Sequence, residues 1–104
     1  MKPARLRPQA RQDRRAEVLY YRHEAGARAA AKLIKALAKA LAELERNPGI
    51  GSPTLGKQIG IDALRIWRLD GFPLGFWYFE RVDHLDIARL VGQRQQADDI
   101  ALEG

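Results

Sequence analysis

The sequence has no cysteine, one serine and two histidines among its 104 residues. Without cysteine, neither a disulfide nor a thiolate zinc site can form. The two histidines, His23 and His84, are far apart in the sequence, which argues against a metal site. The single serine, Ser52, lies in a Gly- and Pro-rich segment with no base beside it, which argues against a nucleophilic hydrolase. We therefore expect no metal, no cofactor and no catalytic nucleophile.

Long apolar runs are also absent. No stretch approaches the roughly 18 apolar residues of a membrane-spanning helix, and the start of the chain lacks the apolar core of a signal peptide. We expect a cytoplasmic protein whose partners include neither a membrane nor a small-molecule substrate. A chain of 104 residues is expected to form a single domain over residues 1–104, with one modest core.

Charge is unevenly distributed along the chain, whose net charge is +5. Residues 1–60 carry 13 Lys and Arg against 5 Asp and Glu, whereas residues 61–104 carry 5 against 8. A basic half indicates an acidic partner, which is either nucleic acid, an anionic lipid surface or an acidic protein segment. The alternative is that these residues only solvate the outer faces of helices, and charge alone does not decide between the two.

Two helices are predicted in the first half of the chain. The segment from Gln9 to Glu24 is rich in helix formers, with Pro8 suited to its first turn and Gly26 to its end. Its apolar face is thin, because Arg14 falls inside it. A longer helix is predicted from Ala27 to Arg46. Its apolar stripe consists of Ile34, Leu37, Leu41 and Leu44, widened by Leu33 and Ala40. The short connection makes the two helices an antiparallel hairpin.

Strand-forming residues concentrate in the second half, where strands are predicted over 64–69, 74–81 and 85–91. The middle strand is apolar on both faces, which is typical of a central strand that is covered on both sides. Residues 1–7 are expected to form either an edge strand or a loose arm, and residues 47–60, with four glycines and two prolines, a loop. At most one helical turn is expected over 99–102. These elements predict an α+β fold, with the helix hairpin packed on a three- to four-stranded, mostly antiparallel sheet.

Arginines and aromatic residues are interleaved in the predicted sheet. The set comprises Arg65, Arg68, Arg81, Arg89 and Arg94, together with Trp67, Trp77 and Phe79. Such a pattern suits stacking on bases or bidentate binding of carboxylates and phosphates. Alternatively, the guanidinium groups brace the sheet by pairing with Asp62, Asp70 or Asp86. The residue types leave both interpretations open.

The order of elements and several short motifs resemble the RelE/ParE superfamily of toxins from type II toxin–antitoxin systems, and its ParE branch in particular. The matching residues span nearly the whole chain. They are Ala10 and Asp13, Ala30 and Leu33, Leu44, Asn47, Pro48 and Gly51, Leu64-Arg65, Trp67, Gly71-Phe72, Phe76 and the run Ile87-Ala88-Arg89-Leu90-Val91. Departures from the family pattern occur at Arg14, at Phe79-Glu80 and at Gly92-Gln93-Arg94-Gln95.

The resemblance implies a toxin without catalytic chemistry that binds and inhibits DNA gyrase and is neutralised by a ParD-like antitoxin with an acidic amphipathic segment. The alternatives are a RelE-like ribosome-dependent mRNA endoribonuclease and a basic nucleic-acid-binding module. The tail, residues 95–104, has no Tyr, His, Lys or Arg, which argues against the nuclease. The candidate target-binding residues are Arg65, Trp67, Arg81, Arg89 and Arg94. The candidate antitoxin-binding residues are Arg14, Val18, Tyr21, Trp77 and Phe79.

Overall fold

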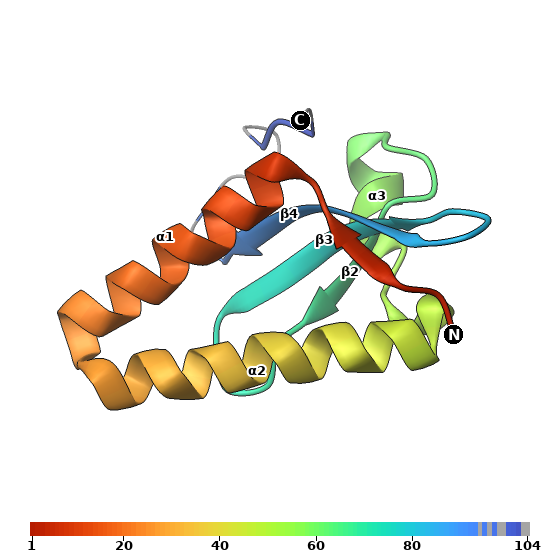
Figure 1. The fold of residues 1–104 in the computed structure, drawn as a ribbon. Helices are drawn as coiled ribbons and strands as arrows, with labels where there is room; N and C mark the ends of the chain where they lie inside the picture. The colour runs from red at the N-terminus through yellow and green to blue at the C-terminus, as the bar shows by residue number, and fades with distance from the viewer. Residues whose placement is uncertain (94, 96, 98–99, 103–104) are drawn as a thin grey trace.

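The computed structural model describes residues 1–93, 95, 97 and 100–102. The elements in chain order are β1 (Ala4–Leu6), α1 (Pro8–Ala25), α2 (Ala27–Arg46), the 3-10 turn η1 (Pro48–Ile50), α3 (Thr54–Ile59), β2 (Arg65–Arg68), β3 (Leu74–Glu80) and β4 (Leu85–Gly92). The strands form one sheet in the order β1-β4-β3-β2, in which only the β1–β4 pair is parallel (Figure 1). The α+β prediction is confirmed, and the first residues form the edge strand.

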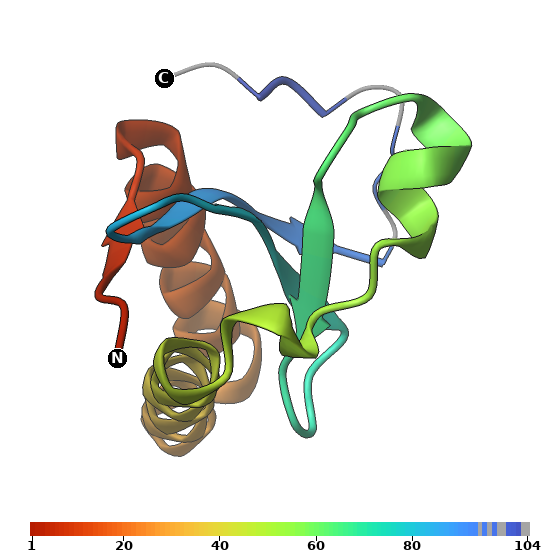
Figure 2. The ribbon, with the colours of Figure 1, turned by 90° about the vertical axis from the view of Figure 1, so that its right-hand side faces the viewer.

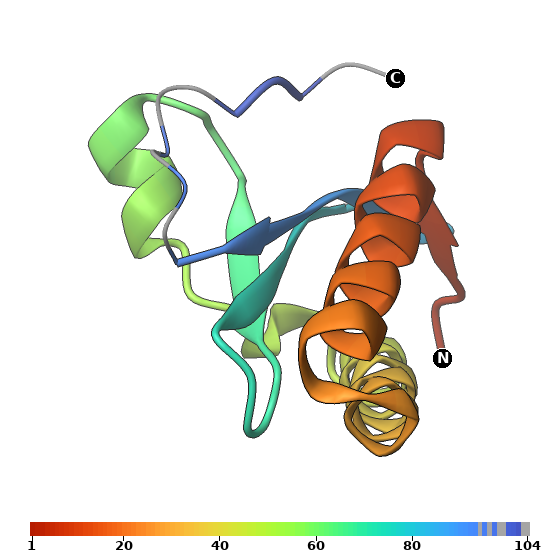
Figure 3. The ribbon, with the colours of Figure 1, turned by 90° about the vertical axis from the view of Figure 1, so that its left-hand side faces the viewer.

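Both faces of the sheet are covered. The α1–α2 hairpin lies against one face, and α3 lies on the opposite side (Figures 2 and 3). On that second face the buried side chains of the sheet also contact Ala97, Ile100 and Leu102 near the end of the chain. Six of the seven residues of β3 are buried, as expected of a central strand. None of the described helices is both long and apolar enough to cross a bilayer.

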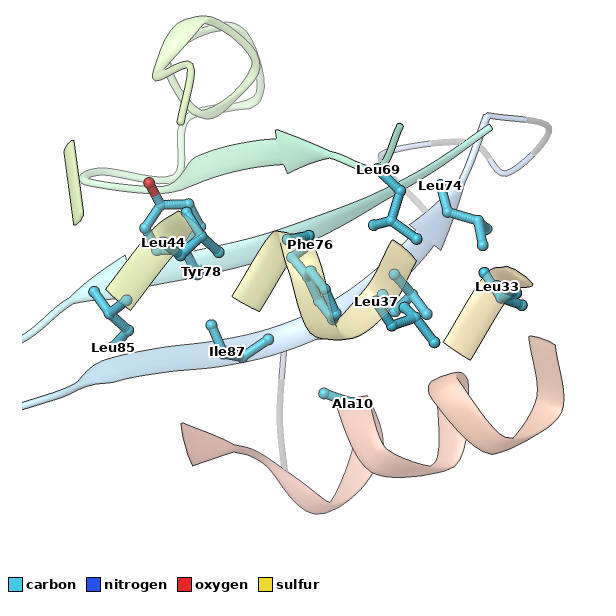
Figure 4. Close-up of a cluster of buried hydrophobic side chains, with 12 residues drawn as sticks. Ala10, Leu33, Leu37, Leu44, Leu69, Leu74, Phe76, Tyr78, Leu85 and Ile87 are labelled. Atoms are coloured by element: carbon cyan, nitrogen blue, oxygen red, sulfur yellow. The ribbon is translucent and has the colours of Figure 1, made fainter. Parts of the chain in front are cut away.

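The first core lies between the helix hairpin and the sheet (Figure 4). From α2 it takes Leu33, Leu37 and Leu44, which pack with Phe76 and Tyr78 of β3. The predicted apolar stripe of α2 was therefore slightly misplaced, because Ile34 is 49% exposed. The sheet covers only part of the predicted stripe, and Ile34 lies at the margin that it leaves uncovered.

The helix α1 contributes little to this core, since Ala10 is its only fully buried residue. The thin apolar face expected from the sequence is thus confirmed. Val18 and Tyr21 add partly buried contacts to this core, and charged groups described below also attach α1 to the sheet.

The prediction that residues 47–60 form a loop was wrong in part, because this segment contains η1 and α3. Leu55 and Ile59 of α3 pack against the second face of the sheet, and this burial stabilises a six-residue helix that local propensity does not favour. Gly56 is needed for close approach: a Cβ there would lie 2.7 Å from the carbonyl oxygen of Leu64. Sequence reasoning took this glycine for a helix breaker.

The Asn-Pro-Gly-x-Gly segment after α2 is fastened by a buried tyrosine. The Tyr78 hydroxyl donates to the carbonyl oxygen of Pro48 at 2.7 Å and accepts from the N–H of Gly51 at 2.9 Å. Gly51 has no room for a side chain, because a Cβ would lie 2.6 Å from the Tyr78 ring. Burial raises the pKa of Tyr78, so the phenol stays neutral in this position.

The helical turn expected over 99–102 falls partly outside the described residues. Ile100, Ala101 and Leu102 are described and are not helical.

Candidate functional site

Arg81 lies after β3 in the β3–β4 hairpin and shares a carboxylate with Arg7. Asp86 accepts hydrogen bonds from Nε and Nη2 of Arg7 at 2.9 and 2.8 Å, and from the same atoms of Arg81 at 3.2 and 2.9 Å. Both guanidinium groups lie over the Phe79 ring, 5.7 and 4.9 Å from its centroid. The hydrogen bonds from Arg7, and then those from Arg81, hold the pKa of Asp86 below its usual range. The Arg81 side chain remains 46% exposed and so is open to a partner.

Arg89 lies on β4, beyond the residues that pair with β1, at the place where α1 packs along the edge of the strand. It donates from Nε and Nη2 to Asp13 of α1 at 2.7 and 3.1 Å, and the same carboxylate accepts the N–H of Leu90 at 3.0 Å. Each of the two charged side chains is only 12% exposed. This largely buried pair helps to fasten α1, with its thin apolar face, to the sheet.

Arg65 and Trp67, on the edge strand β2, contact the segment around α2 and η1. Arg65 Nη1 donates to the carbonyl oxygens of Gly49 at 3.2 Å and Gly51 at 2.6 Å. Trp67 Nε1 donates to Oε1 of Glu43 in α2 at 3.2 Å. Both side chains therefore help to attach the end of α2 to β2.

The predicted target-binding residues do not form one surface. Arg65 and Trp67 lie on β2, Arg81 at the β3–β4 hairpin and Arg89 beside α1, while Arg94 lies outside the described residues. The bracing interpretation had named Asp86, which does pair with Arg81. It had not named Asp13, the partner of Arg89, because the two are 76 residues apart and only the fold brings them together.

The predicted antitoxin-binding residues fall into three places. Arg14 and Val18 line the outer side of the helix hairpin. Tyr21 packs edge-on against Phe72, with ring centroids 5.3 Å apart. Trp77 and Phe79 are 3% and 8% exposed on the second face of the sheet, under residues of this chain itself. Arg14 and Val18 are thus placed together on one accessible surface.

That surface is a groove of about 740 Å³ between α1 and α2. We call it the hairpin groove. Its residues are Pro8, Arg11, Gln12, Arg14, Arg15, Val18, Leu19 and Arg22 of α1, and Ile34, Leu37, Ala38 and Leu41 of α2. Leu19 and Ile34 are 54% and 49% exposed. Four arginines and no Asp or Glu line the groove, so it combines apolar surface with positive charge.

Sequence reasoning had singled out only two of the groove residues for this role. It missed Arg11, Arg15 and Arg22, although their spacing of 4 and 7 residues places them on one side of α1. It also assigned Ile34 to the core. The available signal was that α1 has many cations and too few apolar residues to cover its neighbour.

Chemistry other than binding has little support in the described residues. No group of three or more His, Asp or Glu side chains in the described ranges could hold a metal ion. The ring of His84 hydrogen-bonds to the adjacent exposed Asp83 at 2.7 Å. The four arginines of the hairpin groove suit recognition of an acidic partner.

Comparison with known proteins agrees with this picture. The sequence matches the family described as ParE toxin of type II toxin-antitoxin system, parDE, over residues 4–97. No curated protein sequence matches the chain significantly. A solved chain of the chromosomal ParDE TA system from P. aeruginosa superimposes with a TM-score of 0.74 at 19% identity, covering 88% of this chain and 96% of that one. At this identity the structural likeness establishes the fold alone, whereas the family match spans most of the chain. The chain therefore belongs to the ParE toxin family of type II toxin–antitoxin systems.

Proposed function

We propose that this protein is the toxin of a ParDE-type pair, that it acts in the cytoplasm by binding DNA gyrase, and that a ParD-like antitoxin neutralises it. Membership of the ParE family supports the toxin role and the gyrase target. The observation that carries the antitoxin part is the hairpin groove, because apolar side chains and four arginines line it and no Asp or Glu does.

The hairpin groove suits an amphipathic helix with acidic flanks. A partner helix inserts apolar side chains at positions i, i+3 or i+4 and i+7 between two helices of a groove, and Leu19 and Ile34 offer exposed apolar surface for such anchors. Asp and Glu beside the anchors would meet Arg11, Arg15 and Arg22. Opposite charges on the groove and its partner speed the encounter and fix the orientation of the partner more than they add affinity.

For the gyrase contact, Arg81 is the strongest of the predicted residues. Arg89 donates from all three guanidinium nitrogens within the fold, and Arg65 is partly buried with Nη1 bonded to the carbonyl oxygens of Gly49 and Gly51, so both brace the fold. Arg81 is nearly half exposed, stacks on Phe79 and keeps part of its donor fork open to a partner.

A supercoiling assay tests the target. Purified toxin is expected to inhibit gyrase supercoiling and to trap cleaved DNA, and Arg81→Gln is expected to weaken inhibition about tenfold, the effect of losing roughly 1.4 kcal/mol of binding. Arg68→Gln is the matched control, since Arg68 is exposed and has no ion pair in the described chain. If supercoiling and cleavage stay unchanged at excess toxin, the gyrase assignment is wrong.

Growth assays test the antitoxin surface, with the antitoxin taken from the small reading frame adjacent to the toxin gene. Arg15→Glu with Arg22→Glu should leave the toxin active but reduce neutralisation, because acidic flanks would now meet like charges. Lys57→Glu with Arg68→Glu makes the same change in net charge on the other side of the sheet and should be neutralised normally. Equal neutralisation of both double variants would exclude the hairpin groove as the docking site.

A further inference from the structure

A second charged surface, separate from the hairpin groove, runs along the whole outer side of α2. Arg28, Lys32, Lys35, Lys39 and Arg46 recur at intervals of 4, 3, 4 and 7 residues, which keeps them on one side of a helix with 3.6 residues per turn. We call this set the α2 cationic row. At 1.5 Å per residue it extends over about 27 Å. In Figure 1, α2 is the straight helix at the border of the molecule, with one long side turned away from the sheet.

The cations of this row are available to a partner. Arg28, Lys32, Lys35 and Arg46 are exposed and make no hydrogen bond or ion pair within the described chain. Only Lys39 has a carboxylate partner, Asp70, and both side chains of that pair are exposed, at 58% and 75%. By contrast, ion pairs within the fold engage the carboxylates of Asp13, Glu80 and Asp86.

The arrangement is unfavourable for an isolated helix. No Asp or Glu occurs between Gly26 and Ala42. Like charges four residues apart, such as Arg28 with Lys32 and Lys35 with Lys39, destabilise a helix. Solvation alone would be served equally well by interspersed acids and bases, so the row is better explained by an anionic partner.

We propose that the α2 cationic row binds the phosphate backbone of double-stranded DNA without sequence preference. The row lacks the apolar anchors that a protein helix or a membrane surface needs, since its neighbours on the same side are Ala31, Ala42 and Glu43, whose carboxylate accepts a hydrogen bond from Trp67. Phosphate contacts need no apolar anchor, and a straight row of cations matches a stiff, straight polyanion that carries one charge per 1.7 Å of axis. This surface does not depend on the gyrase proposal, although both would bring the toxin close to DNA.

The salt dependence of DNA binding tests the proposal. With four to five phosphates contacted, log K should fall with log salt with a slope of about −4, so the affinity of the full chain for a 20-bp duplex falls about 250-fold between 50 and 200 mM salt. In Lys32→Gln with Lys35→Gln, the slope should drop to about −2 and the loss to about 16-fold. The matched control, Lys57→Gln with Arg68→Gln, should keep the slope of the unmodified chain.

A variant that should bind DNA more tightly provides a second test, because a loss of folding would weaken binding and could not strengthen it. Asp70→Asn frees Lys39, and should strengthen DNA binding and steepen the slope by about one. Asp62→Asn, which makes the same charge change away from α2, should do neither. Absence of duplex binding at 50 mM salt, equal slopes for the two Gln double variants, or tighter binding to single-stranded RNA or to anionic lipid vesicles would overturn the proposal.

Discussion

Replacing Tyr78 by Phe tests how the fold holds the segment between α2 and α3. The substitution keeps the ring and removes only the hydroxyl, which donates to Pro48 and accepts from Gly51. Gly51 is buried, so its N–H would be left without a partner, at a cost of about 1–3 kcal/mol, while water can reach the half-buried carbonyl of Pro48 at a smaller cost. We expect a total loss of about 2–3 kcal/mol in the free energy of unfolding.

Urea denaturation followed by the fluorescence of Trp67 and Trp77 measures this loss. For a chain of this size it corresponds to a lowering of the urea midpoint by roughly 1–2 M and of the melting temperature by roughly 10–20 °C. Tyr21→Phe is the matched control, because the hydroxyl of Tyr21 makes no hydrogen bond within the described residues. It should change stability by less than about 0.5 kcal/mol.

The pH dependence of the same variant gives an independent check. Burial raises the pKa of Tyr78 in the folded chain above its unfolded value, so the folded state holds this proton more tightly than the unfolded state. Stability from this group is therefore complete below about pH 10 and decreases above it, when the unfolded tyrosine ionises. The difference between the native chain and Tyr78→Phe should narrow above pH 10. Equal stability of the two at pH 7 would refute the reasoning.

Two further predictions concern Gly56 and Asp86. Gly56→Ala should lower the free energy of unfolding by about 1–3 kcal/mol, and with it the melting temperature. Alanine has the higher helix propensity, but its Cβ would lie 2.7 Å from a backbone oxygen. Gly49→Ala, which has nothing within 4 Å of its Cβ, should be nearly neutral, and equal effects of the two substitutions would contradict the steric argument. The pKa of Asp86 is depressed by Arg7 and Arg81, so the stability that this carboxylate contributes is present above about pH 4 and is lost as the pH falls through the folded pKa. Between pH 7 and pH 3 the urea midpoint should therefore fall less in Asp86→Asn than in the native chain. Asp62→Asn should behave like the native chain.

The elements themselves could be predicted well from the sequence. Uninterrupted helix formers between Ala27 and Arg46 predicted α2 at its observed bounds, and the apolar segment 74–81 predicted a central strand. These predictions succeeded because periodicity and chain breakers act locally. The local rule failed at Gly56, where packing against Leu64 outweighs the low helix propensity of glycine.

The functional surfaces were predicted less well, because they depend on which residues the fold leaves uncovered. Trp77 looked like a binding residue, yet the second face of the sheet is covered by α3 and by residues near the end of the chain. Ile34 looked like a core residue and is half exposed in the hairpin groove. Burial is set by neighbours distant in sequence, which no local pattern reports.

The sequence by itself predicted the helix hairpin and the three antiparallel strands, the basic character of the first half and the resemblance to ParE toxins, but not η1 or α3. Tertiary structure alone decided which charges are free. It pairs Asp13 with Arg89 and Asp86 with Arg7 and Arg81, across separations of 76, 79 and 5 residues. These pairs neutralise carboxylates inside the fold, whereas no described Asp or Glu lines the hairpin groove, and in the α2 cationic row only Lys39 has a carboxylate partner among the described residues. A guanidinium that braces a sheet and one that awaits a partner look the same in a sequence, because the difference lies in the distance to the nearest carboxylate.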